Sequence, residues 1–180
     1  RPVSLFWVPV LLVKGAFYGV MTGVTPLIGV SEAGLSEAQV ASLEQAAATI
    51  PVVYDRNMSL GVAVLETLAR RAAAALPGFA VEVRETHHVH KIDAPSGTAL
   101  KLGEAIAAAR GTDPADIHYE SERRGEVPGD HEVVLASATE TLTLAHSVTT
   151  RQVFADGALV AARWVSDQPP GLFTMHDVLE

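Results

Sequence analysis

The sequence predicts an α/β segment followed by an α+β segment. Strand-like apolar runs alternate with helical patterns in the first half of the chain, whereas strand-like patterns follow one another in the second half. Hydrophobic residues make up 48% of the 180 residues and charged residues 19%, which is enough apolar material for packed cores. Alternating elements favour a largely parallel sheet, and contiguous strands favour an antiparallel or mixed one. We expect the change near Asn57.

The first 30 residues admit three interpretations: buried parts of a sheet domain, a poorly defined terminus, or a targeting segment. Residues 3–13 are strongly apolar and follow Arg1. Pro9, Lys14 and Gly15 interrupt the run well short of the ~20 residues that a membrane-spanning helix requires. We therefore favour buried sheet elements and expect no membrane association. Because the chain begins with Arg1 and not with Met, we also expect it to be a fragment.

The remaining elements follow from periodicity and from start and stop signals. Ser36 and Gln39 have the spacing of a capping box, and Pro77 and Gly78 end the longest helical pattern. Expected strands are residues 25–30, 50–54, 79–84, 118–122, 132–136 and 141–149; expected helices are residues 36–48, 59–76, 96–111 and 155–165.

Charge and cysteine content exclude several classes of function. The formal net charge is −8 and the chain has no cysteine. An acidic chain repels a phosphate backbone, so nucleic acid is not an expected partner. Without cysteine there are no disulfides, thiolate metal sites or cysteine nucleophiles, and we expect a cytoplasmic protein.

The densest group of candidate catalytic side chains is His87, His88, His90 and Lys91, which lie within five residues. Histidine exchanges protons near neutral pH, and these side chains form a local cationic patch suited to a carboxylate substrate. A metal cluster is the alternative, but a lysine in its middle argues against it, and we expect no metal. A straight strand would separate the first and last of these residues by about 13 Å. We therefore expect the chain to bend into a loop after Glu85.

A second anion site is expected at the next helix start. Ser96 is a good N-cap, and Gly97 and Thr98 follow in the first turn, where backbone N–H groups lack internal partners. The helix dipole favours negative charge there. An ordinary capped helix start, with no ligand, is the alternative. If both features act together, a substrate with two carboxylates would use them both.

Residues 85–99, E-T-H-H-V-H-K-I-D-A-P-S-G-T-A, match the signature of dihydrodipicolinate reductases almost throughout. Residues 57–62, 129–131, 146–151, 154–159 and 171–179 resemble further family segments in the same order. The similarity runs from residue 34 to residue 179. The chain is therefore similar to 4-hydroxy-tetrahydrodipicolinate (dihydrodipicolinate) reductases and resembles an N-terminally truncated member.

The resemblance implies an activity and roles for individual residues. The family reduces 4-hydroxy-tetrahydrodipicolinate to tetrahydrodipicolinate with NADPH or NADH, in lysine and diaminopimelate biosynthesis. His87 would be the proton donor and acceptor, and Lys91 a proton donor. His88 would bind substrate, and Gly97 and Thr98 would bind a substrate carboxylate.

The resemblance also implies the domains and the cofactor contacts. It implies a partial Rossmann-like dinucleotide-binding domain at residues 1–57, an α+β substrate-binding and oligomerisation domain with a mixed open sheet at residues 58–150, and a C-terminal segment, residues 151–180, that returns to the first domain. Cofactor contacts would come from Asp55, Arg56, Asn57 and Met58, and from a loop containing Gly29, Val30 and Ser31. The family's first strand and glycine-rich turn have no counterpart in residues 1–28.

Family members form homotetramers through the sheet of the substrate domain, so the resemblance implies a homotetramer here. The apolar residues at 133–135 and 142–144 are candidates for that surface. Besides other copies of the chain, the expected partner is a small cyclic dicarboxylate substrate. The alternative function is a dicarboxylate-binding and oligomerisation module that is inactive because the nucleotide phosphate loop is absent.

Overall fold

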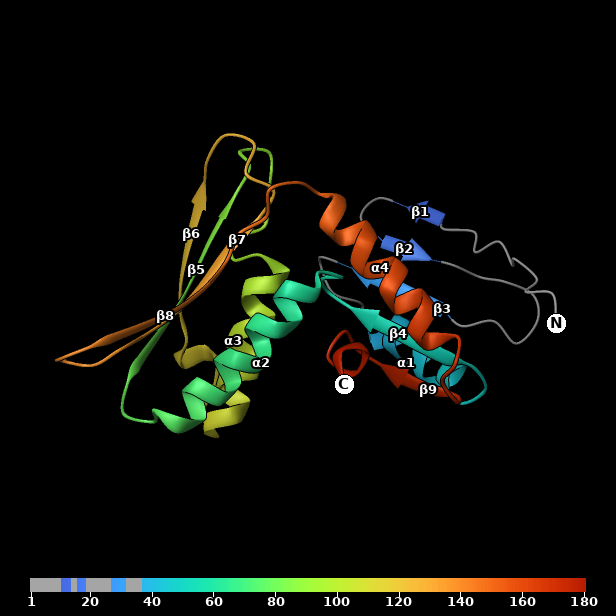
Figure 1. Cartoon of the computed structure of the whole chain (residues 1–180), viewed down its shortest axis with the longest axis horizontal. Helices are drawn as coiled ribbons and strands as arrows, with labels where there is room; N and C mark the ends of the chain where they lie inside the picture. Colours follow the sequence, from blue (N-terminus) through green and yellow to red (C-terminus); the bar gives the residue numbers. More distant parts are fainter. Residues whose placement is uncertain (1–10, 14–15, 19–26, 32–36) are drawn as a thin grey trace.

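In a computed structural model, the chain forms two sheets in two adjacent lobes (Figure 1). The structure describes residues 11–13, 16–18, 27–31 and 37–180. The first sheet has the order β1-β2-β3-β4-β9, with β3, β4 and β9 parallel and β1 and β2 antiparallel. Its strands are β1 (Leu11–Val13), β2 (Ala16–Tyr18), β3 (Leu27–Ser31), β4 (Pro51–Asp55) and β9 (Gly171–Phe173).

The second sheet is mixed and has the order β6-β5-β7-β8. Strands β5 and β6 are parallel, and the pairs β5–β7 and β7–β8 are antiparallel. Its strands are β5 (Ala80–His87), β6 (His118–Arg123), β7 (Asp130–Ala136) and β8 (Thr141–His146). The α/β segment joined to an α+β segment with a mixed open sheet is confirmed.

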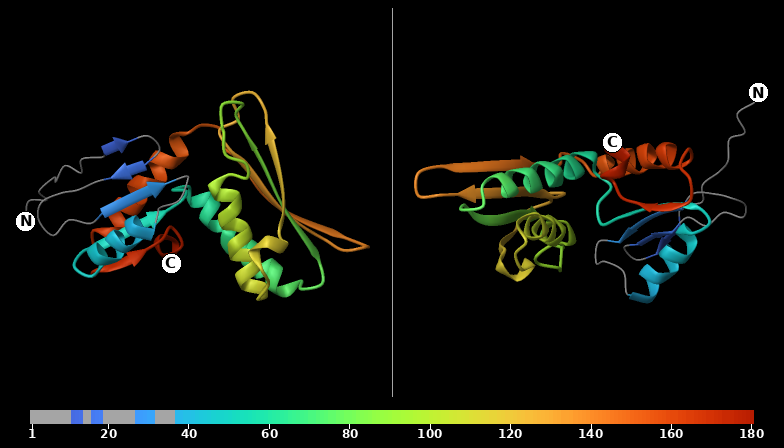
Figure 2. Two further views of the ribbon diagram at one scale, coloured as in Figure 1. Left: turned by 180° about the vertical axis from the view of Figure 1, so that it is seen from behind. Right: turned by 90° about the horizontal axis from the view of Figure 1, so that it is seen from below.

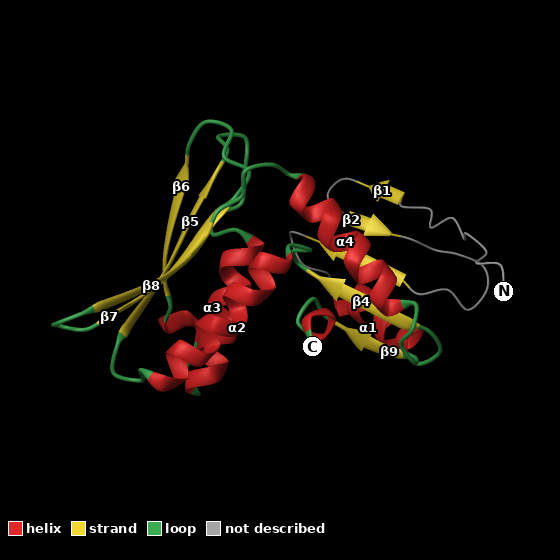
Figure 3. Ribbon diagram, in the orientation of Figure 1, coloured by secondary structure: helices red, strands yellow, loops and turns green. Residues whose placement is uncertain are grey.

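Helices cover both faces of the first sheet and one face of the second (Figures 2 and 3). Helices α1 (Glu37–Ala47) and α4 (Gln152–Val165) lie on opposite faces of the first sheet, while α2 (Leu60–Ala75) and α3 (Gly97–Arg110) lie together on the second. Two short 3₁₀ turns, Pro114–Asp116 and Asp177–Leu179, complete the elements. The strand β9 was not predicted, because a three-residue run after a Pro-Pro-Gly stop carries no periodicity.

The two helices of the second lobe begin where the sequence predicts. Ser59 caps α2 by accepting a hydrogen bond from the Val62 N–H at 3.3 Å, and Ser96 caps α3 by accepting one from the Ala99 N–H at 3.2 Å. Helix α3 ends at Gly111, which adopts the left-handed conformation. Both helix starts therefore have fixed positions next to the junction between the lobes.

The larger core lies between the second sheet and its helices. It is built by buried side chains from β5, β7, α2 and α3, among them Val83, Leu102, Ile106, Val133 and Leu135. Val133 and Leu135 are fully buried, so they do not supply the oligomerisation surface that was expected of them. Strand alternation places Glu82 and Arg84 on the opposite face of the sheet, which no helix covers.

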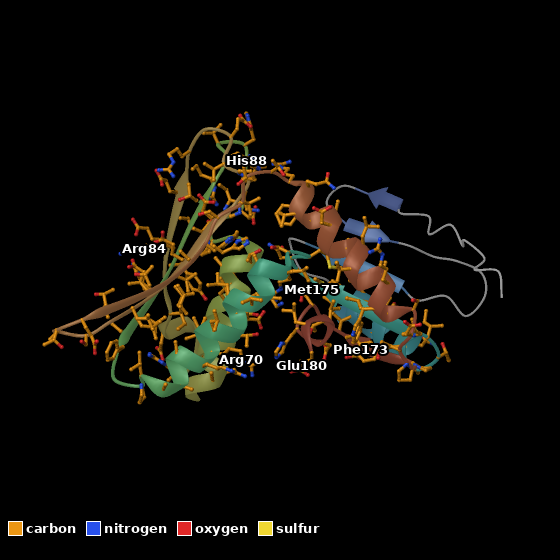
Figure 4. The ribbon with its side chains drawn as sticks, in the orientation of Figure 1. Arg70, Arg84, His88, Phe173, Met175 and Glu180 are labelled. Atoms are coloured by element: carbon orange, nitrogen blue, oxygen red, sulfur yellow. The ribbon has the colours of Figure 1, made fainter. Side chains whose placement is uncertain are left out.

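A smaller core joins the lobes. It contains Val53 of β4, Met58 of the connecting segment, Ala63 of α2, Val165 of α4 and Met175 near the C-terminus. Figure 4 shows Met175 between the start of α2 and the first sheet. The chain crosses between the lobes after β4 and returns before α4. The domain boundaries expected near residues 57 and 150 stay predictions. That these lobes are independent domains stays a prediction.

Among the described residues, no helix is both long and apolar enough to cross a membrane. The apolar residues 3–10, on which the targeting alternative rests, lie outside the described residues.

Candidate active site

His87 is the last residue of β5, and a carboxylate holds its imidazole ring. The Nδ1 atom of His87 contacts Oε2 of Glu85, two residues earlier on the same face of the strand. A carboxylate only accepts, so Nδ1 is the protonated nitrogen. Nε2 has no hydrogen-bond partner among the described residues. Nε2 is therefore the ring nitrogen that is available to a ligand.

Glu85 is a buried carboxylate that stays ionised. Burial opposes its charge, but hydrogen bonds from His87, Ser121 and Arg123 outweigh burial and lower its pKa from 4.5 to about 2. Its Oε1 lies 3.0 Å from Nη1 of Arg123, at the end of the neighbouring strand β6. A permanent negative charge therefore lies behind the His87 ring.

The guanidinium of Arg123 also holds the loop that carries Lys91. Its Nε donates to the carbonyl oxygen of Lys91 at 3.3 Å, and its Nη2 donates to the carbonyl oxygen of Asp93. The Lys91 Nζ lies 2.9 Å from Oδ1 of Asp93. Arg123 thus contacts both Glu85, which holds the His87 ring, and the backbone of the loop that carries Lys91.

The bend in the chain comes two residues later than predicted. Strand β5 continues through His87, because Thr86 pairs with Asp130 of β7 and His87 pairs with Arg123 of β6. The chain then turns, with the Lys91 N–H donating to the carbonyl oxygen of His88 at 3.1 Å. The expected curved loop is present, but the expectation that it starts after Glu85 was wrong.

His131 connects His87 to the start of α3. The rings of His87 and His131 meet edge to face with centroids 5.1 Å apart. The Nε2 atom of His131 lies 3.3 Å from Oγ of Ser96, the N-cap of α3. Burial, followed by the nearby charge of His87, lowers the pKa of His131 from 6.5 to about 3. His131 is therefore neutral, and it connects the His87 ring to the start of α3.

Gly97 and Thr98 form the first turn of α3, as predicted. Gly97 is partly exposed and Thr98 is buried. The Oγ1 atom of Thr98 accepts a hydrogen bond from Nδ2 of Asn57 at 3.0 Å, and Oδ1 of Asn57 accepts one from the Ser59 N–H at 2.8 Å. Asn57 thus ties the start of α3 to the start of α2.

His88 lies outside this cluster in the structure. Figure 4 shows it at the upper end of the second sheet, and its ring lies 6.0 Å from that of His90. Its Nδ1 is buried and has no hydrogen-bond partner within the described part of the chain. Burial, followed by the charge of Arg151, lowers the pKa of His88. No contact joins it to Gly97 or Thr98 in the described structure.

The predicted cofactor residues cluster at the carboxyl ends of two parallel strands. Val30 of β3 pairs with Asp55 of β4, and Gly29 and Ser31 flank Val30 in the strand itself, where a loop was expected. Asp55 and Met58 are buried, whereas Arg56 is partly exposed and pairs with Glu104 at 3.1 Å.

The side chain of Asp55 is fully used within the protein. Its two carboxylate oxygens lie 2.6 and 2.8 Å from Nζ of Lys101 on α3, and Oδ2 also accepts from the Met175 N–H at 3.1 Å. Lys101 pairs in addition with Glu66 of α2 at 2.9 Å. Burial opposes the charge of Lys101, but Asp55 and Glu66 outweigh burial and raise its pKa. This ion cluster joins the lobes beside the candidate site.

Three buried groups have the spacing of a metal site. One ligand atom each from Glu85, His87 and His131 lies within 4.8 Å of the other two. However, Glu85 is already bound to His87 and to the cation Arg123, with Lys91 close by in the loop. A divalent ion would have to displace these contacts next to fixed positive charge, so proton exchange suits the group better than metal binding.

Sequence reasoning missed the roles of Glu85, Arg123 and His131. The signal for Glu85 was present, because residues two apart in a strand share a face. Arg123 and His131 reach the site from other strands, so only the pairing of β5 with β6 and β7 brings them there.

Comparisons with known proteins identify the family of the chain. The family described as dihydrodipicolinate reductase, C-terminus, matches residues 61–179. The chain is 44% identical over 173 residues to the 4-hydroxy-tetrahydrodipicolinate reductase of Caulobacter vibrioides, covering 86% of this chain and 67% of that protein. It is 42% identical over 192 residues to the enzyme of the same name from Rhodopseudomonas palustris TIE-1, covering 97% and 70%.

A solved structure shares the fold. The dipicolinate-bound dihydrodipicolinate reductase from Paenisporosarcina sp. TG-14 superimposes with a TM-score of 0.64 at 24% identity, covering 81% of this chain and 62% of that one. The chain therefore spans about two thirds of the length of these relatives. Together, the family match and these identities show that the chain belongs to the 4-hydroxy-tetrahydrodipicolinate reductase family.

Proposed function

We propose that the protein reduces 4-hydroxy-tetrahydrodipicolinate to tetrahydrodipicolinate with a nicotinamide cofactor, NADPH or NADH, as a cytoplasmic enzyme. The observation that carries the proposal is the chain of contacts from Glu85 through His87 and His131 to Ser96. These contacts support a role for His87 in proton exchange beside a helix start, where the first backbone N–H groups lack partners within the helix. A ring that carries carboxylates and accepts a proton matches these two features.

The roles of the residues follow from this arrangement. The start of α3, at Gly97 and Thr98, receives one carboxylate of the substrate through its backbone N–H groups and the Thr98 hydroxyl. Protonated His87 delivers a proton from Nε2 while Glu85 stabilises the imidazolium. Lys91 is the second proton donor in the loop. We propose that His88 binds the substrate from the same loop after the lobes close, since it lies apart from the helix start in this structure.

The nicotinamide cofactor, when bound, supplies the hydride. The carboxyl ends of β3 and β4 fit such a group, because open α/β sheets bind nucleotides at this edge. Gly29, Val30 and Ser31 lie there beside Asp55 and Arg56. Since the side chains of Asp55 and Met58 are buried, we assign the contacts of this segment to the backbone and to the side chains of Arg56 and Asn57.

A kinetic experiment tests the proposal. Oxidation of NADPH or NADH by the protein is followed in the presence and absence of 4-hydroxy-tetrahydrodipicolinate. His87→Ala and Lys91→Ala are each expected to lower turnover by about 10²-fold or more, as the loss of a general acid does. Near-native turnover in both variants would overturn these roles. If the chain binds pyridine-2,6-dicarboxylate but does not oxidise either nucleotide, it is a binding module.

We also propose that the protein forms a homotetramer through the uncovered face of the second sheet. This face carries charged pairs, such as Glu82 with Arg84 at 2.6 Å, whereas Val133 and Leu135 belong to the core on the other side of the sheet. Light scattering of the wild-type protein and of Arg84→Glu is the test. A tetramer that dissociates in the variant supports this surface, and a monomeric wild type contradicts it.

A further inference from the structure

We infer that Glu85 and Arg123 are positioning residues that hold His87 and the Lys91 loop in their working geometry. The inference rests on the proposed function, in which His87 and Lys91 exchange protons with the substrate. Neither Glu85 nor Arg123 is directed at a ligand by the contacts described above. Each acts through another residue.

Glu85 determines which nitrogen of His87 carries the exchangeable proton. Its carboxylate binds Nδ1, so the neutral ring carries its hydrogen on Nδ1 and presents an unprotonated Nε2. When Nε2 takes up a proton, the same carboxylate stabilises the imidazolium. In Glu85→Gln the Arg123 guanidinium, which only donates, selects the amide oxygen, so the NH₂ group faces Nδ1. An NH₂ group at Nδ1 favours the Nε2–H tautomer, and the stabilising charge is lost.

Space around Nε2 supports this assignment. A Cβ atom at Gly129 would lie 3.0 Å from Nε2 and 3.3 Å from Cδ2 of His87, tighter than ordinary van der Waals contact. Gly129 has a φ of +151°, a conformation that L side chains rarely adopt. The backbone at the start of β7 therefore leaves room at the nitrogen that Glu85 does not bind.

Arg123 couples the two proton donors. One guanidinium group forms an ion pair with the Glu85 carboxylate and donates hydrogen bonds to the carbonyl oxygens of Lys91 and Asp93. These contacts use several N–H groups of the planar fork, which a lysine ammonium cannot reproduce at once. Because the strand ends at His87, Arg123 holds the returning loop beside the ring.

The test compares Glu85→Gln with Glu82→Gln. Both changes remove a carboxylate from β5 that pairs with an arginine, but Glu82 pairs with Arg84 on the uncovered face. Long-range ¹H–¹⁵N spectra of the histidine rings report the tautomer directly, and the spectrum of His87→Gln identifies the His87 signals. We expect Nδ1–H in the wild type and in Glu82→Gln, and loss of that tautomer in Glu85→Gln.

Kinetics provide the second readout. In Glu85→Gln, kcat is expected to fall by about 10²-fold or more, with KM for the substrate changed far less, because a displaced general acid affects the transition state more than binding. Glu82→Gln should retain wild-type kcat. Arg123→Lys should lower kcat and speed amide hydrogen exchange in the loop at Lys91. If Glu85→Gln does not fold, this variant tests the positioning inference.

The outcomes separate this inference from the proposed function. An unchanged His87 tautomer in folded Glu85→Gln, or an unchanged kcat despite a changed tautomer, overturns the positioning role. If Arg123→Lys has the wild-type kcat and unchanged amide hydrogen exchange at Lys91, the positioning role of Arg123 is overturned. If the tautomer changes as expected but the wild-type protein shows no reductase activity, the proposed function fails while the control of the tautomer by Glu85 stands.

Discussion

Asp55 and Lys101 join the two lobes of the protein through a partly buried ion pair, with both carboxylate oxygens of Asp55 within hydrogen-bonding distance of the Lys101 Nζ. Asp55 ends β4 in one lobe, and Lys101 lies on α3 in the other, three residues after Thr98. The pair therefore fixes the start of α3, the proposed carboxylate site, against the strand ends at which we propose the nucleotide binds.

Removing the charge of Asp55 should destabilise the protein. Asp55→Asn leaves the Lys101 ammonium with Glu66 as its remaining carboxylate partner, and we expect a loss of roughly 2–4 kcal/mol in the free energy of unfolding. Urea denaturation measures this change. Arg56→Gln is the control, since its pair with Glu104 is solvent-exposed and should contribute less than about 1 kcal/mol. Equal effects of the two substitutions would contradict a structural role for Asp55.

Acid should destabilise the protein through His131. Its pKa is about 3 in the folded protein and has its ordinary value of 6.5 in the unfolded chain, so the unfolded chain binds more protons between these values. The stabilisation is fully present above pH 6.5 and is lost as the pH falls through about 3, at a slope of roughly 1 kcal/mol per pH unit.

The measurement is urea denaturation at a series of pH values between 7 and 4 (the approximate window set by that shift). His131→Gln should show a shallower decline than the wild type. The lowered pKa of His88 and that of His146 contribute in the same direction, so some slope should remain. The exposed His118 is the control, and His118→Gln should follow the wild type. Identical slopes in the wild type and His131→Gln would refute the assignment.

Gly129→Ala should impair both stability and turnover. The new Cβ atom would press on His87 Nε2, and the positive φ adds backbone strain of about 1–3 kcal/mol. Gly125→Ala provides the comparison, because Gly125 also has a positive φ but has no atom within 4 Å of an added Cβ. We expect both variants to lose stability and only Gly129→Ala to lose kcat. Equal kcat in the two variants would show that space at Nε2 is unimportant.

The Thr98 hydroxyl should contribute to binding of the dicarboxylate. Thr98→Val leaves Nδ2 of Asn57 without its partner and removes a ligand donor, so affinity for pyridine-2,6-dicarboxylate should fall by up to about 10-fold. Thr98→Ser keeps the hydroxyl and should bind nearly as the wild type does. Isothermal titration calorimetry compares the three proteins. Unchanged affinity in Thr98→Val would remove Thr98 from the carboxylate site.

Local sequence signals predicted most of the fold. The starts of α2 and α3, the N-cap Ser96 and the alternation in β5 depend on near neighbours, and they are confirmed. The features that were not predicted depend on strands that are distant in the sequence. Strand β5 extends to His87 because β6 and β7 pair with it, and β9 exists because its three residues add to the edge of β4.

The same division applies to the site. His87, Lys91, Gly97 and Thr98 are visible in one stretch of sequence, whereas the contact of Arg123 with Glu85 requires strands that are parallel neighbours. Likewise, nothing in the sequence near Asp55 indicates that Lys101, 46 residues later, uses both of its oxygens.

We propose above that His87 delivers a proton to a substrate held at the start of α3. The most direct measurement is kcat of His87→Gln at saturating substrate, together with the affinity of the variant for pyridine-2,6-dicarboxylate. We expect kcat to fall by about 10²-fold or more, with dicarboxylate binding largely retained. A variant that binds the dicarboxylate and turns over at the wild-type rate would contradict it.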